Sequence, residues 1–155
     1  MATLFDRPTN EVIASLLSAH PDVAMSLEVA RQRAWELVDP ILLELCRLRI
    51  AMLLGCRAEF ASRTPAAVAA GLDEASVDVL SRWMTSPLFG PRERACLAFT
   101  EQFVVDVAGL DDATAGAVRH ELGEQGLVDF VNALLVVEQR QRLHVIWEQL
   151  FGDVS

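Results

Sequence analysis

The chain has 155 residues, of which 52% are hydrophobic and 23% charged, so it is long enough to bury a core and too apolar to be a disordered polymer. Its net charge of −9 would repel the phosphate backbone of nucleic acid, which excludes nucleic acid as an expected partner. No apolar run reaches the roughly 18 positions that cross a bilayer, so we expect no membrane partner either. These properties predict one globular domain over residues 1–155.

Helical patterns fill the chain, whereas strand signals are nearly absent, since there is no tyrosine and no Asn-Gly or Asp-Gly turn. The first half predicts a short helix over residues 10–19 and a second helix from Pro21 to residue 37, because proline is favoured in the first turn of a helix. Pro40 interrupts the chain. From residue 41 to 63 the sequence predicts one helix of about six turns, apolar on nearly all sides up to residue 54.

The second half predicts further helices separated by short breaks. Thr64 and Pro65 end the long helix, an alanine-rich helix and the segment 73–84 follow, and residues 85–91 supply a loop. An amphipathic helix then begins at Pro91, and Asp111 or Asp112 caps the next one. The last helix, residues 126–151, has apolar side chains at i, i+3, i+4 and i+7. The sequence therefore predicts an all-α fold of six or seven helices.

Cysteine and histidine are too scattered to form a disulfide framework or a metal site. The cysteines are odd in number and form no C-x-x-C pair, and no two histidines have i, i+4 spacing. These residues are Cys46, Cys56, Cys96, His20, His120 and His144. The N-terminus has an acidic residue and a proline where a secretory signal would have a basic end and an apolar stretch. We therefore expect a cytoplasmic protein without a metal or a cofactor.

Polar residues gather toward the end of the long predicted helix. If that helix is continuous, Arg49, Cys56 and Arg63 share a face, and Glu59 lies between the last two. In a functional interpretation the arginines hold a substrate carboxylate while Glu59, its pKa raised by apolar surroundings, moves protons. In a structural interpretation, Arg63 and Glu59 form an ion pair, and Cys56 is a small buried apolar side chain. Both interpretations stay open on spacing alone.

The segments "ELCRLRIAMLLGC", "GPRERACLAFTEQF" and "LVDFVNALLVV" give the chain a family resemblance over about residues 30–150. Together they resemble the alkylhydroperoxidase D-like superfamily, which includes the carboxymuconolactone decarboxylases. The resemblance implies an oligomeric helical bundle, a trimer or hexamer. A helix that is apolar on all sides also needs cover from neighbouring subunits, so both arguments predict a homo-oligomer.

The resemblance also implies roles for particular residues. The redox branch has a glutamate and a C-x-x-C pair followed by histidine. Glu44 matches the glutamate and Cys56 matches the first cysteine. Glu59 stands in place of the second cysteine, and Arg63 stands in place of the histidine. The decarboxylase branch has E-W-x-x-H, of which "EFASR" keeps Glu59 and an aromatic residue. Glu44 lies about 120° from Cys56 around a continuous helix, so it reaches the same pocket only if the helix bends or another subunit helps.

Fewer signals come from the last helix and the tryptophans. The polar run "EQRQR", residues 138–142, is typical of a solvated turn, but in the resembling family this helix faces the motif helix, which makes Arg142 a candidate for substrate binding. His144 and Glu148 are predicted as a surface pair, although His144 could replace the missing histidine. The tryptophans are predicted in the core or at subunit contacts: Trp35, Trp83 and Trp147.

Three functions remain open. The first is an enzyme that applies acid/base chemistry to a small carboxylated lactone or keto compound, with Glu59 as the proton carrier and Arg49 or Arg63 as the carboxylate clamp. The second is a thiol antioxidant in which peroxide oxidises Cys56 to a sulfenic acid that an external thiol resolves. The third is a non-catalytic member that serves assembly or binding.

Overall fold

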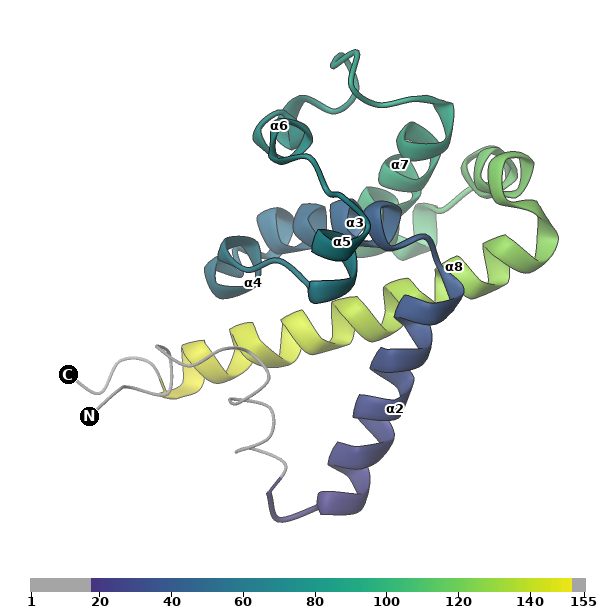
Figure 1. Ribbon diagram of the computed structural model, residues 1–155. Helices are drawn as coiled ribbons and strands as arrows, with labels where there is room; N and C mark the ends of the chain where they lie inside the picture. Colours follow the sequence, from purple (N-terminus) through teal and green to yellow (C-terminus); the bar gives the residue numbers. More distant parts are fainter. Residues whose placement is uncertain (1–17, 152–155) are drawn as a thin grey trace.

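All regular secondary structure in the part of the chain that the computed structural model describes, residues 18–151, is helical (Figure 1). The prediction of an all-α fold is therefore confirmed. The helix predicted over residues 10–19 falls outside the described residues, apart from two positions that form a turn. Within residues 18–151, no helix is both long and apolar enough to span a bilayer.

The first two described helices begin where the sequence predicts. Helix α2 (Pro21–Leu37) has proline in its first turn, and α3 (Pro40–Leu54) has both a proline there and an N-cap, because the Asp39 carboxylate accepts a hydrogen bond from the Leu42 amide at 2.9 Å. Helix α3 is buried along most of its length, as its apolar composition predicts. By contrast, Ala34 is the only buried residue of α2.

The long helix predicted from residue 41 to 63 is wrong, because the chain turns at Gly55. Gly55 has φ +70°, a left-handed conformation that glycine adopts without steric cost, and it ends α3. A short helix, α4 (Arg57–Ala61), then runs in a new direction. Side chains before and after Gly55 therefore do not share the helical face that continuous spacing predicts.

Short elements connect this region to the two remaining long helices. They are α5 (Pro65–Ala69), α6 (Glu74–Asp78) and the 3₁₀ turn η2 (Leu80–Arg82). Helix α7 (Pro91–Val105) and the turn η3 (Val107–Gly109) lead to α8 (Asp112–Phe151), which bends at Gly123, where φ is +78°. Asp111 precedes α8 and accepts a hydrogen bond from the Thr114 amide at 2.7 Å, which confirms the predicted cap.

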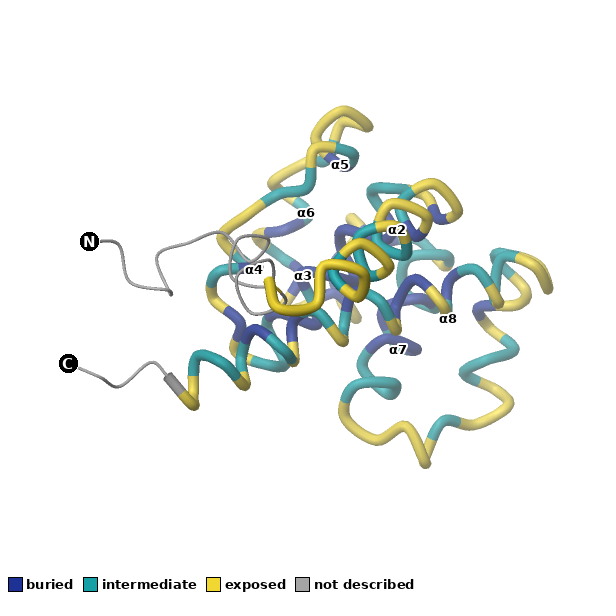
Figure 2. The backbone as a smooth tube through the Cα atoms, turned by 90° about the horizontal axis from the view of Figure 1, so that it is seen from below, coloured by how far each residue is buried: buried dark blue, intermediate teal, exposed yellow. Residues whose placement is uncertain are grey.

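Helix α3 lies at the centre of the arrangement. It packs against α7 and α8, and α2 packs against α8 farther along (Figure 1). Buried positions follow α3 and the inner sides of α7 and α8, whereas much of α2 is exposed (Figure 2). Phe99 of α7 meets Phe130 of α8 edge to face, with ring centroids 5.8 Å apart. This packing places the inner face of α8 opposite α3 and α4.

Candidate functional site

Arg47 is a buried positive charge in the middle of the apolar helix α3. Its side chain is only 4% exposed, and all of its guanidinium nitrogens are hydrogen-bonded. The guanidinium meets the Glu44 carboxylate in a bidentate pair, with Nε to Oε2 at 2.9 Å and Nη2 to Oε1 at 2.7 Å. Because Glu44 lies one helical turn earlier, the two side chains leave α3 on the same face.

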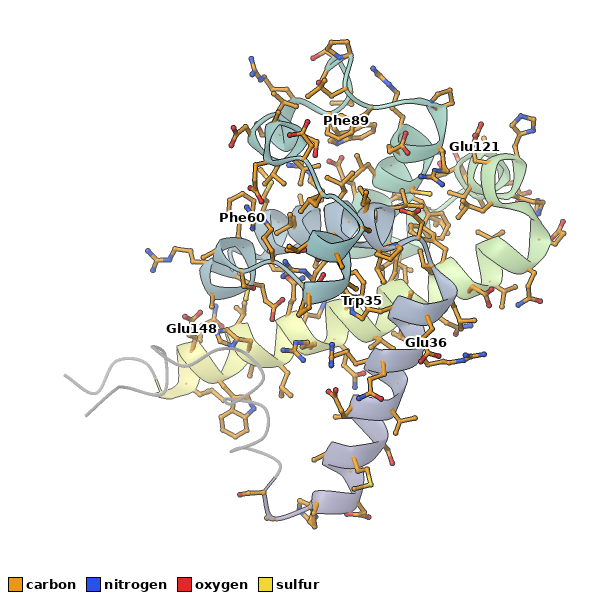
Figure 3. All side chains as sticks on the ribbon, in the orientation of Figure 1. Trp35, Glu36, Phe60, Phe89, Glu121 and Glu148 are labelled. Atoms are coloured by element: carbon orange, nitrogen blue, oxygen red, sulfur yellow. The ribbon has the colours of Figure 1, made fainter. Side chains whose placement is uncertain are left out.

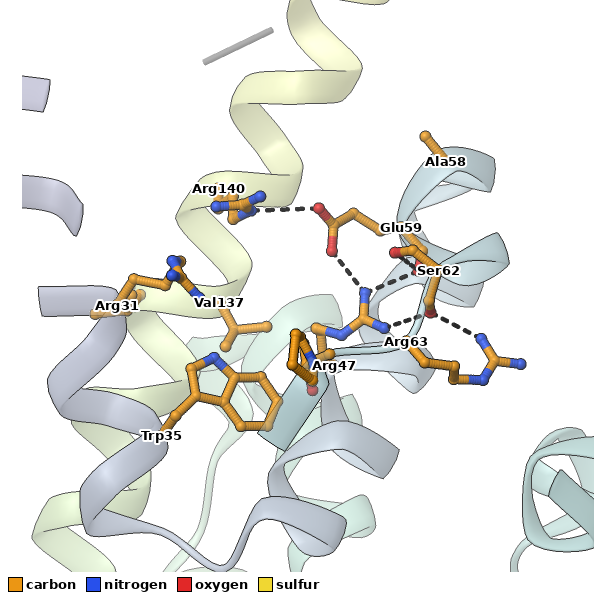
Figure 4. Close-up of a pocket in the computed structure, with 12 residues that line it drawn as sticks. Arg31, Trp35, Arg47, Ala58, Glu59, Ser62, Arg63, Val137 and Arg140 are labelled. Carbon is orange, nitrogen blue, oxygen red and sulfur yellow. Dashed lines mark hydrogen bonds and ion pairs between the residues drawn. The ribbon is translucent and has the colours of Figure 1, made fainter. Parts of the chain in front are cut away.

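The turn at Gly55 brings Glu59 of α4 back to the other side of Arg47. Arg47 Nη1 donates to Glu59 Oε2 at 2.6 Å and to the Glu59 carbonyl at 2.8 Å. Arg140, from α8, donates from Nε to Glu59 Oε1 at 3.3 Å (Figure 4). Glu59 is thereby held between two guanidiniums from two different helices, although it is 81 positions from Arg140 in the sequence.

Glu44, Arg47, Glu59 and Arg140 form a charged cluster, and backbone and hydroxyl groups supply its remaining hydrogen bonds. The Thr64 amide and hydroxyl donate to the two Glu44 oxygens at 3.0 and 2.9 Å, and Arg47 Nη2 also donates to the Ser62 carbonyl at 2.8 Å. Gln141 of α8 donates to the Arg47 carbonyl at 2.9 Å. A buried ion pair needs such additional partners, because desolvation otherwise outweighs the attraction between its charges. The segment after α4 is therefore fastened to α3.

The electrostatics of Arg47 follow from these neighbours. Burial alone would lower its pKa, but hydrogen bonds to Glu44 and Glu59, and the negative charges of both carboxylates, raise it above the ordinary value for arginine. Arg47 is therefore charged at neutral pH. Two carboxylates share this single central cation, and Arg140 adds a second cation on the side of Glu59.

A cleft of about 180 Å³ opens beside the cluster, between α2, α4 and α8. Figure 4 shows Arg31 and Trp35 of α2 on one side and Glu59 on the other, with Arg140 between them. Val136 and Val137 add an apolar wall from α8. Four guanidiniums line the cleft together with a single carboxylate, that of Glu59. Such a lining suits a small ligand that carries negative charge.

The arginines predicted at the site are only partly brought together. Arg63 lines the cleft, but it is paired with Glu74 at 2.9 Å rather than with Glu59. Arg49 projects toward α7, where its Nε meets Glu101 at 2.6 Å, because residues two positions from Arg47 lie on a different side of the helix. Arg142 pairs with Glu138 at 2.6 Å and lies outside the cleft. The predicted common face of Arg49, Cys56 and Arg63 is therefore wrong.

Cys56 and His144 are both buried. The Cys56 side chain is 0% exposed, it does not line the cleft, and burial raises its thiol pKa to about 11. His144 is 1% exposed, so its prediction as a surface residue is wrong. Glu148 lies 3.9 Å from its Nε2, and neither ring nitrogen is hydrogen-bonded to any residue in the described part of the chain. Neither side chain lines the cleft.

The predicted solvated turn at residues 138–142 is half buried. Gln141 is 0% exposed and Arg140 faces the cleft, whereas Arg142 is exposed. Of the tryptophans, Trp83 lies in the core, as predicted, and Trp35 packs against the core while it also lines the cleft.

Sequence reasoning missed three arginines of the site: Arg31, Arg47 and Arg140. For Arg47 a signal existed, because a charged residue inside an apolar helix requires a buried partner. Glu44, one turn earlier, is the obvious one. Arg31 carries no comparable local signal, and Arg140 lies in the polar run at residues 138–142, where Arg142 is the predicted candidate instead. Among the residues that the structure describes, no cluster of histidine, cysteine and carboxylate side chains could hold a metal ion.

Comparison with known proteins matches part of the chain to a protein family. The sequence model of the carboxymuconolactone decarboxylase family matches residues 23–102. The match runs from α2 to α7, and so includes Arg31, Glu44, Arg47 and Glu59, but it ends before α8 and Arg140. A search of curated proteins finds no match to the chain.

Proposed function

The chain belongs to the carboxymuconolactone decarboxylase family, and from this premise we propose that it applies acid/base chemistry to a small carboxylated lactone or keto compound. The observation that supports the proposal is the position of Glu59, the one carboxylate in a cleft lined by four guanidiniums. Its two oxygens are held separately by Arg47 and Arg140. A carboxylate fixed in this way can exchange a proton with a reacting group that enters the cleft.

In the proposed reaction, Arg140 and Arg31 attract the carboxylate of the substrate, and Glu59 transfers a proton to or from the carbon next to its carbonyl group. Guanidinium pairs bind carboxylates with defined geometry, which orients the reacting carbon. The valines of α8 and the Trp35 ring exclude water from the apolar part of the substrate. The cleft volume of about 180 Å³ is below the roughly 300–1,000 Å³ of drug-sized pockets, which limits the substrate to a small molecule.

The proposed arginine roles differ from those expected from the sequence. Arg49 and Arg142 lie outside the cleft. Arg63 lines it, but its nitrogens already serve Glu74 and the carbonyls of Phe60 and Ser62. We therefore propose Arg31 and Arg140 as the clamp. Glu44 has a positioning role, because it orients Arg47 and does not itself line the cleft.

Turnover by the variant Glu59→Gln tests the proposal. Against a panel of lactones and keto acids, we expect its kcat to fall about 100-fold or more, the range associated with loss of a general acid or base. Glu59→Asp, which keeps the charge, should retain measurable turnover. The matched control is Glu74→Gln, which removes an exposed carboxylate that pairs with a cleft arginine. Unchanged turnover in Glu59→Gln would contradict the enzyme proposal and favour a binding or assembly role.

A thiol antioxidant is the weaker alternative. A peroxide would have to reach a side chain that is 0% exposed, and a thiol of pKa about 11 is almost entirely protonated at neutral pH. In a Cys46→Ala/Cys96→Ala variant, the remaining thiol should react with iodoacetamide at pH 8 about 100-fold more slowly than a free cysteine. Labelling at the rate of a free cysteine would support the thiol mechanism instead.

We also propose that the chain forms a homo-oligomer, a trimer or hexamer. Large apolar side chains are exposed on α2 and on the end of α8, among them Met25 at 70%, Val29 at 60% and Leu150 at 66%. Apolar surface of this kind is often covered by another subunit. Light scattering should give a mass of three or six chains, and a monomer would contradict the proposal.

A further inference from the structure

Arg31 has its carboxylate-binding edge occupied by a residue of its own helix. Its Nε and Nη2 meet the two oxygens of Glu28 at 2.8 and 2.5 Å, in the bidentate geometry that a substrate carboxylate would use. Gln32 donates to the same carboxylate at 3.2 Å. The hydrogen bond and positive charge of Arg31 lower the pKa of Glu28, so this carboxylate is ionised at neutral pH. An anion that uses Arg31 must compete with it.

The charges around the cleft are already balanced without a ligand. Arg47 faces Glu44 and Glu59, Arg140 also meets Glu59, and the remaining two pairs are Arg63 with Glu74 and Arg31 with Glu28. A bound carboxylate therefore adds an uncompensated negative charge unless one of these carboxylates moves away. The charge of Glu28 also acts on Arg140. Its departure would therefore strengthen both arginines of the proposed clamp toward an incoming anion.

Glu28 is the carboxylate that can leave at least cost. Glu44 is 0% exposed and Glu59 5%, and both are fastened to the buried Arg47, whereas the Glu28 side chain is 45% exposed and can turn into solvent. Exposed ion pairs between helical neighbours are weak. Arg31 also keeps spare donors, because its Nη1 makes no hydrogen bond to any residue in the range that the structure describes. Arg63 has no unused nitrogen of this kind. Its Nε and Nη2 donate to Glu74, and its Nη1 donates to the carbonyls of Phe60 and Ser62.

We propose that Glu28 is an internal competitor for the anion site, which holds Arg31 in the free protein and is displaced when a carboxylated ligand binds. This inference rests on the proposed function, since it assumes that the cleft receives an anion. It assigns Glu28 a role in affinity and selectivity rather than in chemistry. Ligands with a strongly ionised carboxylate displace Glu28, and uncharged analogues of the same shape do not. Glu28 therefore lowers the affinity of the cleft for carboxylates and leaves its affinity for neutral molecules of the same shape unchanged.

Binding of benzoate, compared with its uncharged analogue benzamide, tests this role without requiring turnover. Measured by titration calorimetry at constant ionic strength, Glu28→Gln should bind benzoate 3- to 10-fold more tightly than the wild type and benzamide equally. Arg31→Gln should weaken benzoate binding at least 5-fold. In the double variant the gain should vanish, because Glu28 acts only through the arginine that it occupies.

The matched control is Glu36→Gln, which removes the same charge and the same kind of pair from the same helix. Glu36 pairs with Arg33 at 2.8 Å with both side chains more than 60% exposed, and it points away from the core (Figure 3). An equal gain in Glu28→Gln and Glu36→Gln would show a general charge effect and overturn the inference. So would unchanged benzoate affinity in Glu28→Gln, or no benzoate binding by either protein. Failure of the proposed chemistry has a separate sign, namely unchanged turnover in Glu59→Gln.

Discussion

Arg47 satisfies two buried carboxylates from different parts of the chain, and no other described cation contacts Glu44. Replacing it with methionine would leave Glu44 without a counter-charge in a fully buried position. We expect Arg47→Met to reduce the free energy of unfolding by about 3–5 kcal/mol, the usual cost of breaking a buried pair from one side. Urea denaturation measures this difference. The exposed Arg57→Met is the control, and should change stability by less than about 0.5 kcal/mol.

A triple replacement distinguishes the loss of the ion pairs from the cost of leaving buried carboxylates without a counter-charge. If Arg47→Met is combined with Glu44→Gln and Glu59→Gln, no buried charge remains without a partner, and much of the stability should return. A loss below about 1 kcal/mol in the single variant would contradict the buried position of the cluster. A triple variant no more stable than Arg47→Met would show instead that the hydrogen bonds to the Ser62 and Glu59 carbonyls provide most of the stability.

Among the candidate residues that the sequence indicates, Glu59 is marked by chemistry rather than by spacing. Glu59 stands out because a carboxylate in "EFASR" matches a family motif, and the structure places it on the cleft. The prediction for Arg49 and Arg63 depends on a seven-residue spacing along one helix, which no longer applies because α3 ends before Gly55. Arg31 and Arg140 could not be predicted, because their nearness depends on how α2 and α8 pack.

At the scale of elements, Gly55 determines whether Glu59 reaches Arg47. A Cβ at Gly55 would meet no atom within 4 Å, so the cost of Gly55→Ala is confined to the backbone at φ +70°. We expect a loss of about 1–2 kcal/mol, with a smaller loss for Gly55→Asn, since asparagine tolerates the left-handed region. The control is Gly116→Ala, in α8 and equally open, which should gain about 0.5–1 kcal/mol. Denaturation curves of the three variants measure these changes.

Equal effects of Gly55→Ala and Gly116→Ala would mean that residue 55 is helical, as the sequence pattern suggests. Helix starts were predicted well, because Pro21, Pro91 and Asp111 act through local geometry. The end of α3 was missed because the apolar and polar spacing continues across the glycine. Periodicity records which residues are apolar, and it does not record a change in chain direction. The burial of His144 was missed for a similar reason, since it depends on packing between helices.

At the scale of the whole molecule, the chain has an unusual set of titrating groups. The chain has 13 arginines, no lysine and no tyrosine, so cysteine is the only side chain that ordinarily titrates between about pH 8 and 11. All three cysteines are 0% exposed. Burial raises the pKa of Cys56 to about 11 and of Cys46 to about 12, and it raises that of Cys96 as well.

These shifts predict a loss of stability in alkali. Below about pH 8.5 the thiols are protonated in both states, so stability is fully present. Above that pH the unfolded chain releases protons that the folded chain keeps, and the free energy of unfolding falls by about 1.4 kcal/mol per pH unit for each cysteine. The fall continues until the folded thiols ionise, from about pH 11 upward. Urea midpoints under reducing conditions at pH 8, 9 and 10 should therefore decrease at each step.

The slope of this pH dependence, rather than the absolute stability, identifies the groups responsible. In a variant with all three cysteines changed to alanine, small cavities lower stability at every pH, but the curve from pH 8.5 to 10.5 should become nearly flat. With one cysteine restored, the slope should return to about 1.4 kcal/mol per unit. A wild-type curve that is already flat would mean that the thiols reach solvent. In that case Cys56 could ionise in the folded protein, and the thiol mechanism would regain its chemical basis.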